Sequence, residues 1–327
     1  MSKEASEHLP FKNAFFEILF QGSFPIDTIQ TVRTSNSLQQ SVASEEFIGK
    51  QWQLFQGKKY PNDINPSRYR FVNAEVANGN LSITLDPCVS YRNFTGSRGL
   101  EFRESFRPEF WPNPTAVGLL LITANNELVV THRIGLSDYK PGGLNTSVGG
   151  FMEITKDNNV EGNPSVAVAI ARETQEELGI DPKTELTKLI CIGAVHNPLS
   201  TATEIMFSAS TSLPTAEVIK RINDGENKVY VVENSPHGVA DQIKNLSHAW
   251  VVTGLAYLVL HGQNEFGIDW LRNVSEALNR HGKNYSNEQF RIRAEEWHTR
   301  RVRRRTAESA LLATKVLSQL IPSFTIG

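Results

Sequence analysis

Glu173, Glu176 and Glu177 are spaced so that a helix would carry all three carboxylates on one face. Their mutual repulsion would be relieved by a divalent cation that prefers oxygen ligands. Mg²⁺ suits such a site best, since it binds a few carboxylates together with water and substrate phosphates, and Mn²⁺ is the expected substitute. The alternative is a solvated acidic turn of an amphipathic helix, and the pair of adjacent glutamates alone would favour that alternative.

The residues around these acids form a longer pattern. The stretch Arg172–Ile180 resembles the signature R-E-U-x-E-E-x-G-U of the Nudix hydrolases, where U is a bulky aliphatic residue, and only Thr174 is irregular. Upstream, Gly149-Gly150 and Glu153 resemble the opening of the family's loop. The resemblance covers about residues 113 to 262. It implies that the three glutamates hold the metal and that Arg172 braces the loop by pairing with an acid.

One position departs from the family pattern. The signature has a glutamate eight residues before the arginine, and this chain has Pro164 there. An insertion from Ile154 to Gly162 also lengthens the loop that precedes the helix. Glu161 is a candidate replacement for the missing acid, and Glu153 is a candidate partner for Arg172. The departure affects the expected loop geometry more than metal binding, because the helical acids are intact.

A second resemblance lies outside this signature and runs over roughly residues 50 to 262. Trp52-Gln53-Leu54-Phe55, Arg68-Tyr69-Arg70-Phe71 and Tyr91-Arg92-Asn93-Phe94-Thr95-Gly96 resemble the N-terminal part of the UDP-glucose pyrophosphatase branch of the Nudix hydrolases. The later pieces, among them Asn197 with its Ser/Thr loop and Glu204 at a strand start, follow the same order. This similarity implies a UDP-sugar substrate.

Several further residues are candidates for binding the substrate. Aromatic, amide and arginine side chains beside a glycine turn suit a nucleotide or sugar, although chemistry alone favours a plain turn with surface arginines. Arginine forks also match phosphate and uracil. The candidates are Tyr91, Arg92, Asn93, Arg98, Arg133 and Asn197. Glu204 is a candidate general base or further metal ligand, with an ordinary edge-strand residue as the equal alternative.

The elements that position these residues follow from hydrophobic periodicity. Strands are expected at 117–123 and 128–133 as a hairpin, and at 147–151, 186–195, 204–210 and 228–233. The acidic helix is expected to begin near Asn163 or Ser165, with Asn163 as the N-cap, and to end at Gly179. Further helices are expected at 214–223, 245–261, 270–281 and 288–321. These elements predict an α/β/α sandwich with a mixed sheet.

Four parts of the chain are expected. Residues 1–45 are expected to be irregular, 46–112 to form a small α+β substrate-recognition domain, 113–262 the Nudix domain and 263–327 a C-terminal helical extension. A helix start is expected at Ser44, and alternation through Leu81, Ile83 and Leu85 predicts a strand.

Composition limits the classes of partner. The net charge of −2 argues against a general nucleic-acid or anionic-membrane binder. The apolar run 249–260 is too short to span a bilayer, and the two distant cysteines favour a reducing compartment, cytoplasmic or nucleocytoplasmic. The basic run 300–305 suits anionic lipid or RNA, but the overall charge favours a solvated helix end. The oligomeric state is not readable.

The expected activity is Mg²⁺-dependent hydrolysis of a UDP-sugar to UMP and a sugar 1-phosphate. A different nucleoside diphosphate conjugate, such as ADP-ribose, NADH, coenzyme A or a dinucleoside polyphosphate, is a second hypothesis. A third is a Nudix-fold module that binds a nucleotide without cleaving it. The intact acidic triad argues against the third hypothesis, and Pro164 keeps it open.

Overall fold

A computed structural model describes residues 16–35, 38–55, 67–97, 100–133, 143–197, 201–222, 227–245 and 250–283. These residues lie in one compact unit that ends at Lys283. The predicted helix at 288–321 and the basic run 300–305 lie outside the described residues, as do Arg98 and the side chain of Arg133.

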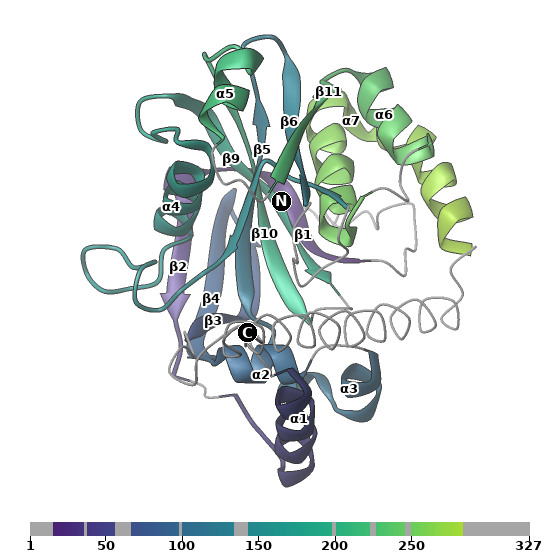
Figure 1. Ribbon diagram of the computed structural model, residues 1–327. Helices are drawn as coiled ribbons and strands as arrows, with labels where there is room; N and C mark the ends of the chain where they lie inside the picture. Colours follow the sequence, from purple (N-terminus) through teal and green to yellow (C-terminus); the bar gives the residue numbers. More distant parts are fainter. Residues whose placement is uncertain are drawn as a thin grey trace, which may run out of the picture. The chain divides into compact units, whose positions relative to one another are not determined.

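A mixed eight-stranded sheet forms the centre of the unit (Figure 1), with strand order β1-β9-β10-β5-β6-β11, β8 beside β5 and β7 beside β6. Strands β10 and β5 run parallel, and the other neighbouring pairs are antiparallel. The strands of this sheet are β1 (Glu17–Pro25), β5 (Thr115–Ile122), β6 (Glu127–Arg133), β7 (Leu144–Asn145), β8 (Val148–Phe151), β9 (Leu186–Asn197), β10 (Ala202–Thr211) and β11 (Asn227–Glu233).

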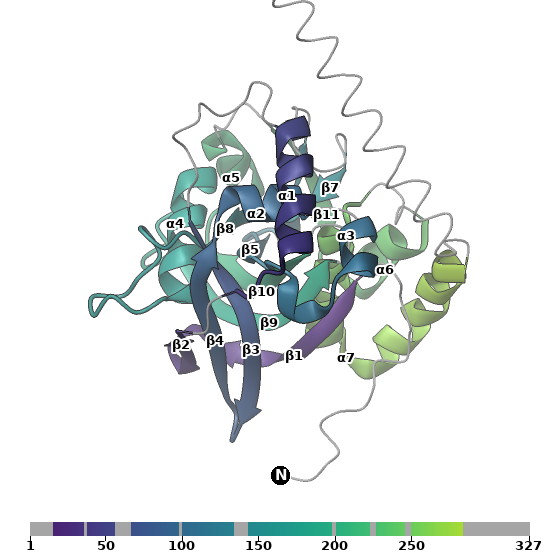
Figure 2. The same ribbon diagram turned by 90° about the horizontal axis from the view of Figure 1, so that it is seen from below.

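A small second sheet of order β2-β4-β3 lies beside the first. Figure 2 shows it together with the helices of the N-terminal region. Its strands are β2 (Ile29–Arg33), β3 (Arg68–Ala77) and β4 (Asn80–Val89), and the helices are η2 (Ile26–Thr28), α1 (Val42–Phe55), α2 (Tyr91–Gly96), α3 (Leu100–Ser105) and η3 (Pro108–Phe110). The remaining helices are α4 (Val166–Leu178), α5 (Thr215–Arg221), α6 (Pro236–Asn245) and α7 (Val252–Lys283).

Both faces of the large sheet are buried at its centre, around β5. Val117, Leu119 and Leu121 of β5 pack into one core with α4, α5 and the small sheet. Leu120, which points to the other face, packs into a second core with α6 and α7. Burial on both faces explains why β5 is an almost continuous apolar run and not an alternating one. The predicted α/β/α sandwich is confirmed, and so is the β5–β6 hairpin.

The structure corrects three expectations about the elements. The N-terminal segment is not irregular, because β1 joins the large sheet and β2 joins the small one. The helix expected at 245–261 begins only at Val252, and α6, which was not expected, ends at Asn245. The predicted boundary at residue 262 falls inside α7, which contains a kink at Gly267, where φ is 84°. None of the helices in the described ranges has the length and hydropathy needed to cross a membrane.

Candidate active site

Helix α4 begins and ends through local interactions. The hydroxyl of Ser165 accepts a hydrogen bond from the amide of Val168, so Ser165 and not Asn163 is the N-cap. At the other end Gly179 has a φ of 62°, a left-handed conformation that favours glycine and ends the helix. Thr174, the irregular position of the signature, is fully buried, and its hydroxyl donates to the carbonyl of Ile170. Because this bond satisfies the hydroxyl, a polar residue can occupy a buried position that is aliphatic in the signature.

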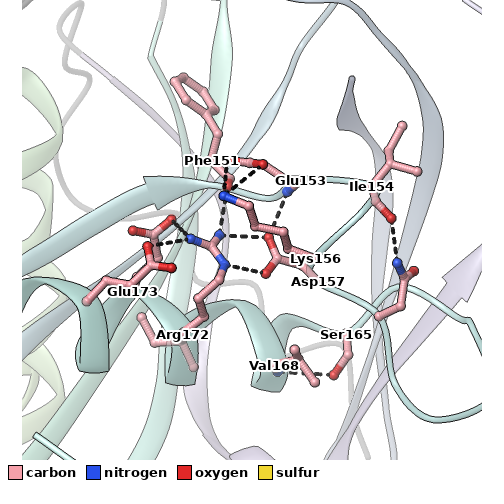
Figure 3. A network of polar contacts seen from close by, with 12 residues as sticks. Phe151, Glu153, Ile154, Lys156, Asp157, Ser165, Val168, Arg172 and Glu173 are labelled. Atoms are coloured by element: carbon pink, nitrogen blue, oxygen red, sulfur yellow. Dashed lines mark hydrogen bonds and ion pairs between the residues drawn. The ribbon is translucent and has the colours of Figure 1, made fainter. Parts of the chain in front are cut away.

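Arg172 is held by Asp157, an acid within the inserted segment (Figure 3). Nε of Arg172 lies 2.8 Å from Oδ1 of Asp157, and Nη2 lies 2.9 Å from Oδ2, so the pair is bidentate. The Asp157 side chain is fully buried, and Nη2 also donates to the carbonyl of Phe151 at 3.3 Å. The bond to Asp157 is the main reason why the pKa of Arg172 is raised further above its usual value.

The two acids that the sequence suggested for this loop, Glu153 as the partner of Arg172 and Glu161 as the replacement for the missing acid, do not contact the arginine. Glu153 pairs with Lys156, with Oε2 3.2 Å from Nζ. Glu161 is exposed and accepts a bond from Asn163. Both expectations were therefore wrong. The backbone is the reason: the amide of Glu153 donates to Oδ2 of Asp157, which turns Asp157 inward beneath the arginine.

Two of the helical glutamates contact Arg172, and the third contacts strand β8. Nη1 of Arg172 lies 2.8 Å from Oε1 of Glu173 and 3.1 Å from Oε2 of Glu176. Glu177 accepts a hydrogen bond from the amide of Gly149 at 3.1 Å. Gly150 leaves room for Glu173, because a Cβ at that position would overlap its carboxylate. Burial raises the pKa of Glu173, and the charge of Arg172 partly opposes that effect.

Glu204 approaches the same strand from β10. Its Oε1 lies 4.0 Å from where a Cβ on Gly149 would be and 2.9 Å from the equivalent point on Gly118. The hydroxyl of Tyr257, a fully buried residue of α7, donates to Glu204 and also lies 3.5 Å from the carbonyl of Ile205. Burial, followed by the charge of Glu204, raises the pKa of Tyr257 well above its usual value, so the phenol stays protonated. Glu177 and Glu204 therefore both lie beside Gly149.

The donor set fits a divalent cation. Carboxylate oxygens are the hard ligands that Mg²⁺ and Mn²⁺ take in proteins, and Gly149-Gly150 gives the acids room to approach the backbone. No group of three or more His, Cys, Asp or Glu side chains is already arranged as a metal cluster among the described residues. Glu173 and Glu176 instead share Nη1 of Arg172.

The predicted substrate residues of the N-terminal part lie in and around helix α2. Ser90 caps this helix by accepting from the amide of Asn93, so the expected turn at Tyr91–Gly96 is helical. Arg92 pairs with Glu45 of α1 at 2.9 Å. Tyr91 is buried, and the guanidinium of Arg68 lies 5.0 Å from its ring centre. A role for these residues in substrate binding stays a prediction.

The remaining candidates lie at strand ends. Asn197 is buried at the end of β9, beside His196. His196 stacks on Trp111 with ring centres 5.8 Å apart, and burial, helped by the charge of Arg103, lowers the pKa of His196 to about 4. Arg133 ends β6, and its backbone pairs with Asn227.

Two residues of the site were missed in the sequence. Asp157 is an acid in the insertion, and the sequence alone did not show which of that segment's acids turns inward. Tyr257 is the one hydroxyl-bearing aromatic residue in the apolar run 249–260, and an isolated polar group in a buried helix was the available signal.

Comparison with known proteins supports the superfamily. The family model described as NUDIX domain matches residues 112–233, a segment that includes β8, α4 and Glu204. The match supports the Nudix superfamily and, as a general class, a hydrolase of nucleoside diphosphate linkages. No curated protein matches the chain.

Two solved structures illustrate the wider likeness. DR0079 from Deinococcus radiodurans is 15% identical with a TM-score of 0.34, and the likeness covers 59% of this chain and 97% of that one. NrtR from Shewanella oneidensis is 16% identical with a TM-score of 0.31, covering 56% of this chain and 85% of that one. The family match, and not these likenesses, supports the class.

We expect Asp157→Asn to destabilise the fold by about 3 kcal/mol, since it leaves the guanidinium of Arg172 without its bidentate anion. Urea unfolding followed by circular dichroism measures the change. Glu161→Gln, at an exposed acid of the same loop, is the matched control and should stay within about 0.5 kcal/mol of wild type. Equal midpoints for the two variants would contradict the importance of the Asp157–Arg172 pair.

We expect Gly118→Ala to destabilise the protein by roughly 1–3 kcal/mol, because its Cβ would overlap the hydroxyl of Tyr257 and crowd Glu204. Gly149→Ala is the control, since its Cβ would have no neighbour closer than 3.8 Å. Gly118→Ala should cost less stability in the Tyr257→Phe background than in wild type, because the overlapping oxygen is gone. Thermal unfolding of wild type, the three single variants and the double variant measures this, and an equal loss from Gly118→Ala in both backgrounds would refute the contact.

Proposed function

We propose that this protein hydrolyses the diphosphate linkage of a UDP-sugar to give UMP and a sugar 1-phosphate. The observation that carries the reaction class is the meeting of α4, β8 and β10, where Glu173 and Glu177 reach Gly149-Gly150 and Glu204 lies beside Gly149. The UDP-sugar is supported by the sequence resemblance of residues 50–262 to that branch of the Nudix hydrolases.

The residues have distinct roles in this proposal. A divalent cation on Glu173, Glu176 and Glu177, Mg²⁺ or in its place Mn²⁺, would neutralise phosphate charge and lower the pKa of a bound water. Glu204 accepts the proton of the attacking water, and the Tyr257 hydroxyl orients that carboxylate. The water oxygen bonds to one phosphorus, the bond from that phosphorus to the bridging oxygen breaks, and the bridging oxygen leaves on the other phosphate ester.

Arg172 keeps the acids in place before substrate binds. Its guanidinium is anchored on one side by Asp157 and the carbonyl of Phe151, and it offers Nη1 to Glu173 and Glu176 on the other side. This fixed cation lowers the cost of gathering carboxylates on one helix face. Preorganised charge of this kind contributes strongly to catalysis of phosphate-ester and anhydride cleavage.

The selectivity of the enzyme is proposed to come from Tyr91, Arg92, Asn93 and Arg98 of the N-terminal part, together with Arg133 and Asn197. In this proposal the protein acts on small nucleotides and not on nucleic acid, inside the cell.

We expect UDP-glucose or UDP-galactose with Mg²⁺ to yield UMP and sugar 1-phosphate, and Glu177→Gln to lower kcat by at least about a hundredfold. Chromatography of products from a panel of nucleoside diphosphate conjugates measures this. Glu185→Gln, at an acid that pairs with Arg221 away from the site, is the control and should keep full activity.

The same panel separates the alternatives. Turnover of ADP-ribose, NADH, coenzyme A or a dinucleoside polyphosphate without turnover of any UDP-sugar would refute the proposed substrate and keep the reaction class. Tight nucleotide binding without cleavage of any conjugate would refute catalysis and favour a binding module.

A further inference from the structure

Residues at the start of strand β3, in the small sheet, form backbone hydrogen bonds with the loop that links β8 to α4. The amide of Tyr69 donates to the carbonyl of Met152, and the amide of Ile154 donates to the carbonyl of Ser67, both at 3.2 Å. Arg68 and Glu153 form an antiparallel bridge between them. The backbone of residues 152–154, immediately after Gly149-Gly150 and Phe151, is therefore paired with the N-terminal part of the chain.

The side chain of Tyr69 extends this contact to the inserted segment. Its ring is fully buried in the core, and its hydroxyl donates to Oδ1 of Asn158 at 2.6 Å. The amide group of Asn158 in turn donates to the carbonyl of Ile154. Burial raises the pKa of Tyr69, so its hydroxyl stays a donor at neutral pH. Asn158 follows directly after Asp157, the residue that holds Arg172.

A second contact joins the N-terminal part of the chain to the end of strand β8. The guanidinium of Arg68 lies between two rings, 5.0 Å from the centre of Tyr91 and 4.9 Å from the centre of Phe151. The carbonyl of Phe151 accepts a hydrogen bond from Nη2 of Arg172. Arg68 therefore packs against the residue whose backbone helps to anchor the arginine of the site.

We propose that the small sheet positions the β8–α4 loop for catalysis, with Tyr69 as the positioning residue that keeps Asp157 on Arg172 through Asn158. The catalytic part of this inference rests on the proposed function. The N-terminal part would then have a structural role beside the acidic helix α4, in addition to any role in substrate selection.

The length of the loop explains the need for such a contact. The insertion adds residues whose ordering costs conformational entropy, and Pro164 replaces the acid that the family places on the helix side. The loop's own bonds, from the amide of Asp157 to the carbonyl of Glu153 and from the amide of Ser165 to the carbonyl of Asp157, are local. The bond from Tyr69 spans 89 residues and fixes this local structure to a separate sheet.

The test is Tyr69→Phe in the full chain, which keeps the buried ring and removes only the donor. We expect the amides of Asp157, Asn159 and Gly162 to exchange hydrogen for deuterium roughly tenfold faster. The amides of α5, for example Val218, should exchange at the wild-type rate, because the loss is local. Tyr230→Phe, at an exposed tyrosine of β11, is the matched control and should leave both sets unchanged.

Kinetics then shows whether the position of the loop affects the reaction. Tyr69→Phe should lower kcat roughly tenfold with little change in KM, since substrate contacts are intact. Asn158→Ala should do the same, and the double variant should be no slower than Asn158→Ala alone. Additive losses, or a change in KM alone, would refute the action through Asn158.

The exchange experiment tests the positioning role without relying on enzymatic activity. Wild-type exchange at Asp157, Asn159 and Gly162 in Tyr69→Phe overturns the positioning role, whatever substrate is cleaved. Faster exchange everywhere, α5 included, also overturns it, because the hydroxyl would then stabilise the whole fold. A wild-type protein that cleaves no conjugate refutes the proposed function, while local acceleration of exchange in the loop still supports positioning by Tyr69.

Discussion

The bidentate ion pair between Arg172 and Asp157 is the interaction on which the site depends. It fixes a guanidinium at the start of the acidic turn of α4, and the remaining nitrogen of that group reaches Glu173 and Glu176. Without Asp157 the partly buried guanidinium would lose its bidentate anion, and of its ion pairs only those of Nη1 with Glu173 and Glu176 would remain. The amide of Glu153 donates to the same Asp157, and the carbonyl of Phe151 accepts from Arg172, so the pair joins α4 to the loop that follows β8.

Sequence reasoning recovered what depends on local pattern. The spacing of the glutamates, the glycine at the end of α4 and the strand periodicities predicted the sandwich and the acidic face, because helices and strands repeat at fixed intervals. Contacts between residues far apart in the sequence could not be predicted in this way. Asp157 could not be told from Glu153 or Glu161, since the choice depends on how the loop folds, and β1 pairs with β9 across more than a hundred residues.

The departure from the Nudix signature changes which residues support the loop, while the three glutamates of the signature are all present on α4. Pro164 precedes the N-cap Ser165, while Asp157 supplies the acid from within the insertion. Tyr257 of α7 and Tyr69 of β3 each bring one hydroxyl to the site or its loop from outside the signature. Tyr257 thus contacts the carboxylate of Glu204, and Tyr69 contacts the loop between β8 and α4.

The most direct test of the central claim is a crystal structure of the full chain soaked in Mn²⁺, with anomalous data that locate the ion. We predict an anomalous peak between the carboxylates of Glu173, Glu176 and Glu177 and the backbone of Gly149-Gly150, with Arg172 still paired to Asp157. The absence of a peak there at saturating Mn²⁺, or a peak only elsewhere on the protein, would contradict the account.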